Sequence, residues 1–353
     1  MEINILRQEE QTALQHILTN SSRIVICAHK SPDGDAMGSS LGWASYLTSL
    51  GKQVTVVMPD AFPMFLQWLP GADAIKRFDK KPDDVQQAFN KADTVFCLDF
   101  NTTSRTEDLQ PVIDSCKATL VIIDHHLYPQ VNASLVISRP ELSSTCEIIF
   151  SIIWQLGGYD KISQAAAQCL YCGMMTDTGG FTYNSTRPEI FFIISQLLAK
   201  GIDKDLIYNK VFHNYTEDCL RLRSYIIFKK LKVIKQLHAS YYSVTRADMT
   251  KFHFQKGDLE GLVNDPLKMK GHKLSIAFRE DTEVDGRILV SLRSSCGFHC
   301  QKMATEFFNG GGHADAAGGK LLNSNIAEAE QIALRAILAY KDELSEAIVL
   351  KKS

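Results

Sequence analysis

At 353 residues the chain is longer than a single hydrophobic core usually accommodates, so two domains are expected. Hydrophobic residues make up 45% and charged residues 22% of the chain, which is typical of a globular protein and argues against a disordered one. The formal net charge of −2, without a run of Lys or Arg, argues against binding of long duplex nucleic acid.

Short apolar runs alternate with helical patterns in the first 200 residues. The runs are rich in β-branched residues and almost wholly apolar, as in strands of a parallel sheet covered on both faces. We expect strands at residues 23–29, 53–58, 94–100 and 119–126. We expect helices at residues 36–50, 144–156, 163–176 and 186–200. Ser144 with Glu147 and Thr186 with Glu189 have the spacing of capping boxes. This alternation predicts a doubly wound, mainly parallel α/β domain over residues 1–200.

A second alternation follows a helical, charged segment at residues 201–237, which we expect to be a connector. In this second alternation we expect strands at residues 240–246, 272–280 and 287–295 and helices at residues 299–308 and 326–344. A glycine-rich loop is expected at residues 308–319, between the two helices. The pattern predicts a second, smaller α/β domain over residues 238–353.

Acidic and imidazole side chains lie at the ends of the predicted strands. They are His29 at the end of the first strand with Asp33 and Asp35 after it, Asp99 at the end of the third, Asp124, His125 and His126 at the end of the fourth, and Asp177 at the end of a helix. Ligands bind at the carboxyl ends of strands in open α/β sheets. A single Asp at such a place is commonly a helix cap, and PDGD alone is an ordinary turn. The repetition at several ends favours a metal site.

Converging carboxylates would repel one another and raise one another's pKa values unless cations offset their charge. Oxygen ligands together with imidazoles suit Mn²⁺, with Mg²⁺ or Co²⁺ as substitutes. Two such ions, roughly 3.5–4 Å apart, polarise a phosphoryl group and generate hydroxide near neutral pH. Adjacent strand residues point to opposite faces, so we do not expect His125 and His126 to bind one ion together. Asp124 is expected to orient one of them. The pattern predicts hydrolysis of phosphate esters or anhydrides.

Five segments, in order, resemble the motifs of a known family. AHKSPDGDAMGSS, LDF, DHH and GMMTDTGGF are similar to the four motifs of the DHH phosphoesterase superfamily, and GGGHADAAGG is similar to the glycine-rich motif of its associated C-terminal domain. Length, domain order and the segment VSLRSS most resemble the nano-RNase and pAp phosphatase group and its cyclic di-AMP phosphodiesterase relatives. The resemblance implies an active site in the cleft between the two domains.

The resemblance also implies roles for individual residues. One metal ion would be held by His29, Asp33 and Asp99, and the second by Asp35, Asp99, His125 and Asp177. Asp99 would bridge the two ions, and His126 would be a catalytic residue that faces the scissile phosphate.

In the second domain the resemblance implies phosphate or nucleotide binding by Arg293 and His313, with His313 also catalytic. Arginine suits this role because it makes bidentate contacts with phosphate. Gly310, Gly311 and Gly312 would let backbone N–H groups approach an anion closely. Arg105 is a further phosphate-binding candidate. Phe100 has an aromatic face suited to a base, but we expect it in the core.

These implied roles describe a two-metal, Mn²⁺-dependent phosphoesterase that hydrolyses short oligoribonucleotides to mononucleotides and converts pAp to AMP. Three alternatives stay open: a cyclic di-AMP or pApA phosphodiesterase, a pyrophosphatase or short-chain exopolyphosphatase, and a catalytically silent nucleotide-binding module. The expected partner is short RNA or a small nucleotide, not long duplex nucleic acid, and a homodimer is left open. The complete set of candidate ligands disfavours the silent module.

The sequence predicts a cytoplasmic protein that does not associate with membranes. No run of eighteen apolar residues occurs, and residues 1–18 are acidic and amphipathic, unlike a signal peptide. The nine cysteines are odd in number and lie mostly in apolar runs, as Cys27, Cys97 and Cys146 do. Such cysteines are typical of buried thiols in a reducing compartment.

Overall fold

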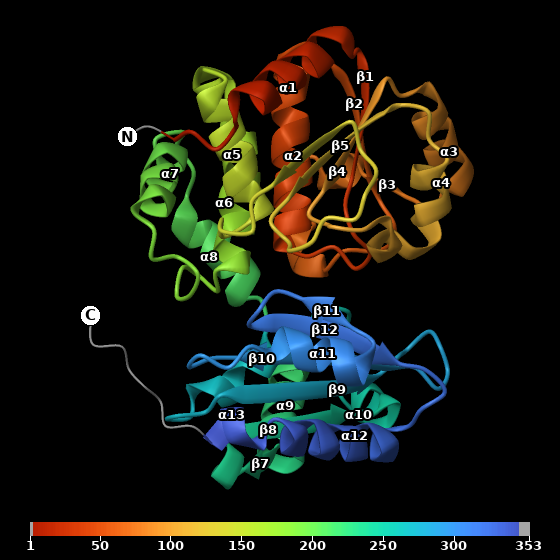
Figure 1. Ribbon diagram of the computed structural model, residues 1–353, viewed down its shortest axis with the longest axis vertical. Coiled ribbons are helices and arrows are strands. Elements are labelled where there is room, and N and C mark those ends of the chain that lie inside the picture. The colour runs from red at the N-terminus through yellow and green to blue at the C-terminus, as the bar shows by residue number, and fades with distance from the viewer. Residues whose placement is uncertain (1–2, 346–353) are drawn as a thin grey trace. The chain divides into compact units, whose positions relative to one another are not determined.

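The chain folds into two compact units, which divide between Asn214 and Tyr215 (Figure 1). The computed structural model describes residues 3–345, so residues 1–2 and 346–353, which the predicted domains include, lie outside the described residues. Across residues 3–345, no helix has the length and apolar character needed to cross a membrane.

The first unit is built on a six-stranded, fully parallel sheet. Its strands are β1 Arg23–Cys27, β2 Gln53–Met58, β3 Lys76–Arg77, β4 Thr94–Leu98, β5 Thr119–Asp124 and β6 Leu135–Ser138. Their order is β3-β2-β1-β4-β5-β6, and every neighbouring pair is parallel. The order reverses between β1 and β4, which makes this the switch point where a doubly wound sheet binds ligands. The predicted doubly wound fold is confirmed.

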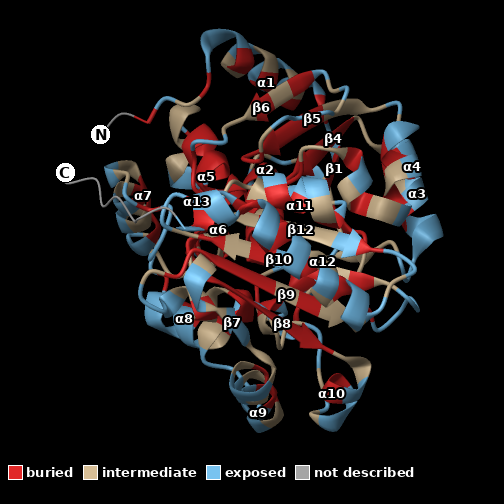
Figure 2. Cartoon of the chain, turned by 60° about the horizontal axis from the view of Figure 1, so that its bottom comes forward, coloured by how far each residue is buried: buried red, intermediate tan, exposed pale blue. Residues whose placement is uncertain are grey.

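Helices cover both faces of this sheet. They are α1 Gln8–Asn20, α2 Gly34–Ser49, α3 Pro82–Lys91, α4 Gln110–Asp114, α5 Thr145–Gln155, α6 Gln164–Asp177, α7 Pro188–Leu198 and α8 Lys204–Phe212. Ile24 and Ile26 of β1 face the core formed with α2, α5 and α6, whereas Val25 and Cys27 face that formed with α3 and α4. β4 is buried along its whole length and β5 from Val121 to Asp124 (Figure 2). Burial on both faces explains the continuous apolar runs.

The two predicted capping boxes are only partly found. The Ser144 hydroxyl accepts a hydrogen bond from the Glu147 backbone N–H at 3.0 Å, which caps α5. The Glu147 carboxylate, however, accepts from the backbone and hydroxyl of Ser143, so the reciprocal half of that box is absent. The box at Thr186 is wrong, because α7 begins at Pro188 after Arg187 and has no side-chain cap. Proline at the first helical position fixes that start instead.

The second unit contains a six-stranded mixed sheet. Its strands are β7 Lys232–Ile234, β8 Ala239–Val244, β9 Leu274–Glu280, β10 Ile288–Ser294, β11 Gly311–Gly312 and β12 Ala316–Leu321. The order is β11-β12-β10-β9-β8-β7, with β8 and β9 parallel and the other pairs antiparallel. Its helices are α9 Glu217–Tyr225, α10 Arg246–Lys251, α11 Cys300–Phe308, α12 Ile326–Ala339 and α13 Lys341–Ser345. α11 and α12 pack on one face, and α9 and α10 lie over part of the other.

The segment predicted as a connector, residues 201–237, is shared between the units. It contains α8 in the first unit and α9 and β7 in the second, and the units divide after Asn214.

The glycine-rich segment 308–319 is not the loop that the sequence predicts, because β11 and much of β12 lie within it. A Cβ atom on Gly310 would lie 1.9 Å from the carbonyl oxygen of Gly318, and one on Gly319 would lie 2.3 Å from that of Phe308. Gly312 has φ +139°, a backbone angle that residues other than glycine rarely adopt. These three glycines therefore allow β11 and β12 to pack closely against each other and against the end of α11.

Candidate metal centre

The six predicted metal ligands of the first unit come together beyond the carboxyl ends of β1, β4 and β5. They are His29, Asp33, Asp35, Asp99, His125 and Asp177. His29 follows β1, Asp99 follows β4 directly, and His125 follows β5. Asp33 is the N-cap of α2, where its Oδ1 accepts hydrogen bonds from the backbone of Asp35 and Ala36. The site lies at the switch point because these elements meet there.

His29 points an unpaired ring nitrogen at two carboxylates. Its Nδ1 lies 2.8 Å from the carbonyl oxygen of Lys30, so Nδ1 carries the proton and Nε2 is left with its lone pair. Within residues 3–345, the buried Nε2 has no hydrogen-bond partner. It lies 3.5 Å from Asp99 Oδ2 and 3.9 Å from Asp33 Oδ2. Burial and Arg105 oppose protonation, but the two carboxylates outweigh them and raise the pKa of His29. A cation among these three side chains would bind both oxygens and the lone pair.

His125 occupies a similar position in a second group. Its Nε2 lies 3.5 Å from Asp177 Oδ2, 3.8 Å from Asp35 Oδ2 and 3.5 Å from Asp99 Oδ1. Burial lowers the pKa of His125, but Asp177 and Asp99 raise it by more, so the pKa of His125 is well above its usual value. The donor atoms of Asp35, His125 and Asp177 all lie within 4.8 Å of one another, close enough to ligate one ion.

Asp99 lies between the two groups and faces both. Its Oδ2 is directed to His29 and its Oδ1 to His125, each at 3.5 Å, and Oδ1 also accepts a hydrogen bond from Thr145 Oγ1 at 3.0 Å. Burial opposes ionisation, but His125 and His29 outweigh it and hold the pKa of Asp99 well below its usual value. Its backbone has φ +65°, which is uncommon outside glycine. Asp99 is therefore a charged carboxylate held in a single orientation.

The pKa of Asp35 shows that the negative charges of this cluster are unfavourable to one another without a cation. Its carboxylate accepts hydrogen bonds from the backbone N–H groups of Thr145 at 2.6 Å and Cys146 at 2.9 Å, at the N-terminus of α5. Those donors favour the charged form. Burial, Asp99 and Asp177 nevertheless raise the pKa of Asp35 well above its usual value. Thr145, which contacts both Asp35 and Asp99, is a site residue that the sequence reasoning missed.

His126 is held by hydrogen bonds at both ring nitrogens. Its Nε2 lies 2.8 Å from Arg105 Nη1 and its Nδ1 lies 2.7 Å from Asp124 Oδ1. A guanidinium only donates, so Nε2 accepts and Nδ1–H donates to the fully buried Asp124. Burial lowers the pKa of His126, and Arg105 adds to this, so the ring is neutral. Asp124 was expected to orient either His125 or His126, and the histidine that it orients is His126.

The geometric reason given for separating His125 from His126 is wrong. β5 ends at Asp124, so the two histidines are not adjacent strand residues. Their rings are instead nearly perpendicular, 4.9 Å apart at 74°. Both lie near Asp99 Oδ1, His125 Nε2 at 3.5 Å and His126 Nδ1 at 3.8 Å, but only His126 is hydrogen-bonded to Asp124 and Arg105.

The predicted phosphate-binding residues of the second unit lie on β10 and around β11. Arg293 is on β10, is half-buried and donates from Nη1 to the carbonyl oxygen of Leu292 at 2.9 Å. No carboxylate of residues 3–345 forms an ion pair with it. His313 directly follows Gly311–Gly312, and its backbone N–H donates to the carbonyl oxygen of Ala316. An unpaired, half-buried guanidinium next to a glycine-rich turn is suited to an anion.

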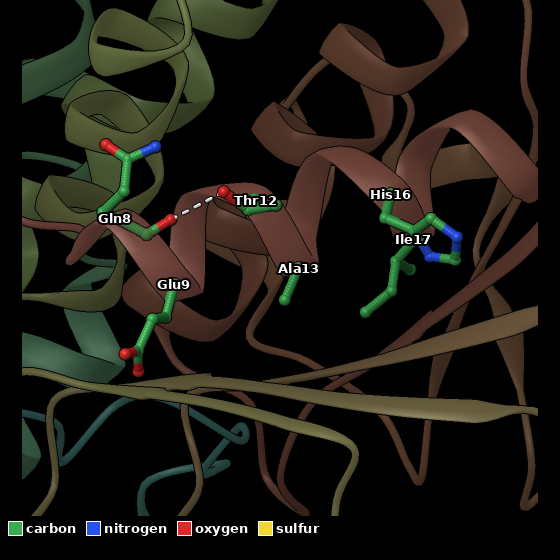
Figure 3. A pocket seen from close by; sticks show the side chains of 6 residues that line it. All are labelled: Gln8, Glu9, Thr12, Ala13, His16 and Ile17. Carbon is green, nitrogen blue, oxygen red and sulfur yellow. Dashed lines mark hydrogen bonds between the residues drawn. The ribbon is translucent and has the colours of Figure 1, made fainter.

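Two other features carry no site. Phe100 is fully buried, which confirms the prediction that it belongs to the core. An open hollow of about 520 Å³ runs along α1 (Figure 3). It is lined by Gln8, Glu9, Thr12, Ala13, His16 and Ile17. These side chains come from one helix and do not converge on a point, as the polar groups of a binding site would.

Comparison with protein families matches both units. Residues 23–174 match the DHH family, N-terminal domain, and residues 237–340 match the DHHA1 domain. The matched ranges contain His29, Asp33, Asp35, Asp99, His125 and Arg293, whereas Asp177 lies just beyond the first range.

Three known proteins are similar over most of the chain. An exopolyphosphatase-related protein from Bacteroides fragilis is 43% identical, with a TM-score of 0.91 over 97% of this chain and 99% of that one. The bifunctional oligoribonuclease and PAP phosphatase NrnA of Thermus thermophilus is 27% identical over 92% of this chain and 91% of its own length. The cyclic-di-AMP phosphodiesterase GdpP of Geobacillus thermodenitrificans is 26% identical over 93% of this chain, which spans 49% of that protein.

Proposed function

The chain belongs to the DHH family and carries a DHHA1 domain, and on that premise we propose that it is a two-metal phosphoesterase acting on short nucleotides. Its substrates would be short oligoribonucleotides, cleaved to mononucleotides, and pAp, converted to AMP. The observation that carries the proposal is Asp99, whose two oxygens each face a histidine of a different ligand group at 3.5 Å.

Two sets of residues would hold the ions. His29, Asp33 and Asp99 form the first set, and Asp35, Asp99, His125 and Asp177 form the second. The unpartnered lone pair of His29 and the raised pKa of Asp35 support this assignment, because both describe a site short of positive charge. Carboxylates with imidazoles favour Mn²⁺, with Mg²⁺ or Co²⁺ as substitutes. When bound, two such ions supply hydroxide near neutral pH and neutralise charge that develops on the phosphoryl group.

His126 would contact the scissile phosphoryl group together with Arg105. Asp124 fixes the orientation of the His126 ring, and Arg105 lies 2.8 Å from its Nε2. The neutral His126 ring, and not a carboxylate, lies against Arg105 Nη1. The Arg105 guanidinium would therefore bind a phosphate oxygen without competition from a carboxylate at that nitrogen.

Arg293 would bind a second phosphate of the substrate, with His313 and the backbone of residues 310–312. Arg293→Ala should raise KM about tenfold to a hundredfold, the usual effect of losing hydrogen bonds to a charged group. Bound Mn²⁺ should not change, because Arg293 is not among the proposed ligands. Steady-state kinetics on pAp and metal analysis of the purified variant measure both effects.

Arg221→Ala provides the matched control for Arg293→Ala. Arg221 is exposed on α9 and is paired with Glu217, so its loss should leave KM unchanged. A lower Mn²⁺ content in Arg293→Ala, or an unchanged KM, would show that Arg293 does not bind substrate phosphate.

Two alternative functions have specific support. The name of the Bacteroides fragilis relative suggests polyphosphate or pyrophosphate, and that of the Geobacillus relative suggests cyclic di-AMP. A side-by-side assay with Mn²⁺ separates them, using pAp, a dinucleotide, a pentanucleotide, cyclic di-AMP and pyrophosphate. The proposal requires pAp and the dinucleotide to have the highest kcat/KM. Pyrophosphate or cyclic di-AMP as the best substrate would replace it with the matching alternative, and binding without turnover would favour a silent module.

Substrate length provides a further prediction. Long single strands bind through many phosphate contacts, with a log–log salt slope near −0.7 per phosphate neutralised. The chain has net charge −2, and its proposed phosphate contacts are few and local. We expect kcat/KM to fall as oligonucleotides lengthen beyond about five residues, with weak salt dependence. A series from about two to twenty-four nucleotides at two ionic strengths measures this. Equal or better efficiency on long strands with a steep salt slope would instead indicate an exonuclease that acts on long single strands.

A further inference from the structure

The N-terminus of α5 contacts two of the proposed metal ligands at once. Thr145 Oγ1 donates a hydrogen bond to Asp99 Oδ1 at 3.0 Å, and the Thr145 backbone N–H donates to Asp35 Oδ2 at 2.6 Å. The backbone N–H of Cys146 donates to the other oxygen of Asp35 at 2.9 Å. The start of this helix therefore holds a carboxylate proposed to serve both ions and a carboxylate proposed to serve the second.

Asp99 needs such a contact if its two oxygens are to serve different ions. The terminal torsion of an Asp side chain is broad, so the rotamer alone does not fix the plane of the carboxylate. A hydrogen bond to Oδ1 fixes that plane, with Oδ2 directed to His29 and Oδ1 to His125. The donor is a neutral hydroxyl, which leaves the negative charge of Asp99 available to a cation.

A buried ion pair lies next to Thr145 and fixes the chain on both sides of it. The Glu147 side chain is 1% exposed, and its Oε1 lies 3.0 Å from Arg187 Nη1. Its Oε2 accepts hydrogen bonds from the backbone N–H and the hydroxyl of Ser143, each at 2.7 Å. Arg187 lies in the segment that follows Asp177, so the same ion pair connects that segment to α5.

Close packing between helices also sets the position of α5 relative to Asp35. A Cβ atom on Gly173 of α6 would lie 2.2 Å from Cys146 Sγ and 3.0 Å from Asp35 Oδ1. Glycine at that position is what allows the two helices and the carboxylate to meet. Because packing already places α5, removal of the Thr145 hydroxyl alone should leave the fold intact.

We propose that Thr145 is a positioning residue, which orients Asp99 and Asp35 for the two ions and is held in place by the ion pair of Glu147 with Arg187. This inference rests on the proposed function. A role in folding alone would change the stability of the metal-free protein and not its affinity for Mn²⁺. Removing a group that orients a metal ligand typically weakens metal binding by about tenfold to a hundredfold.

Calorimetric titration of the full chain with Mn²⁺ tests the proposal. Thr145→Val keeps the shape of the side chain and the backbone N–H but removes the donor to Asp99, so its Kd for Mn²⁺ should rise by about tenfold to a hundredfold. Thr145→Ser restores the hydroxyl and should return the Kd to within about threefold of the wild type. At saturating Mn²⁺ the KM for pAp should not change in either variant, because Thr145 is not proposed to contact substrate.

Arg187→Gln tests the ion pair while Thr145 is unaltered. It removes the charge that faces Glu147, and the Kd for Mn²⁺ should rise by about tenfold. Two substitutions at exposed positions are matched controls and should keep wild-type Mn²⁺ affinity. They are Thr12→Val, on α1, where the hydroxyl donates only within its own helix, and Arg221→Gln, on α9.

Wild-type Mn²⁺ affinity in Thr145→Val, or a loss that Thr145→Ser does not restore, would overturn the positioning role. An unchanged Kd in Arg187→Gln would remove the ion pair from it. If the melting temperature of the metal-free protein shows that Thr145→Val does not fold, Thr145→Ala repeats the test. Turnover is measured separately. The expected loss of Mn²⁺ affinity without hydrolysis of any phosphate ester by the wild type would refute the proposed function alone. Hydrolysis of pAp with equal Mn²⁺ affinity in wild type and Thr145→Val would refute the positioning role alone.

Discussion

Asp99→Asn should abolish phosphoesterase turnover with Mn²⁺, Mg²⁺ or Co²⁺, with a loss on the order of a thousandfold or more. Asp99 faces His29 with one oxygen and His125 with the other, so neutralising it removes charge from both proposed ion sites. Asparagine has the same shape and tolerates the φ of +65° found here, so the variant should fold. Turnover on pAp and metal content of the same sample measure the effect.

Asp83→Asn is the matched control for Asp99→Asn. Asp83 is exposed in the first turn of α3 and belongs to neither ligand group. That variant should retain wild-type activity and metal content. More than a tenth of wild-type activity in Asp99→Asn would rule out a carboxylate that serves both ions.

His125→Ala and His126→Ala should fail in different ways. His125 directs Nε2 to three carboxylates, so His125→Ala should lose bound metal as well as turnover. His126 is held by Asp124 and Arg105 instead, so His126→Ala should keep its metal and lose rate by about a hundredfold to ten-thousandfold, as for other positioned catalytic histidines.

Metal analysis and kcat of the two histidine variants, purified in parallel, decide between these roles. His16→Ala controls for loss of a histidine, because His16 is on α1, away from the strand ends. Loss of an ion from His126→Ala, with full occupancy in His125→Ala, would mean that the roles are reversed.

The strands that position the site could be predicted because a strand that is buried on both faces is apolar at nearly every position. β1, β2, β4 and β5 are mostly apolar and begin where the sequence places them, although β1, β4 and β5 each end two residues earlier than predicted. β3, β6 and β7 were missed, since they are two to four residues long and a run that short has no distinctive pattern. β12 was missed because its AAGGKL sequence is typical of a loop. Its Gly319 is required by the close approach of the end of α11, which only the tertiary structure reveals.

The candidate site could be predicted in its residue types and location, but not in its hydrogen bonds. Acids at several strand ends must lie near one another once the sheet is parallel, so the convergence of Asp99 with His29 and His125 follows from topology. The choice of His126 as the partner of Asp124 depends on where β5 ends, to within one residue. The hydrogen bonds from Thr145 depend on the placement of α5 against Asp35 of α2 and against Asp99 after β4, which are 110 and 46 residues away in sequence. No local pattern encodes such contacts.

The most direct test of a two-metal site is the number of Mn²⁺ ions bound per chain. It is measured by equilibrium dialysis of the full-length protein and compared with turnover on pAp in the same samples. If Asp99 serves two ions, the wild type binds close to two, turnover requires both, and Asp99→Asn binds fewer and is inactive. Full turnover in a protein that holds one ion or none would contradict it.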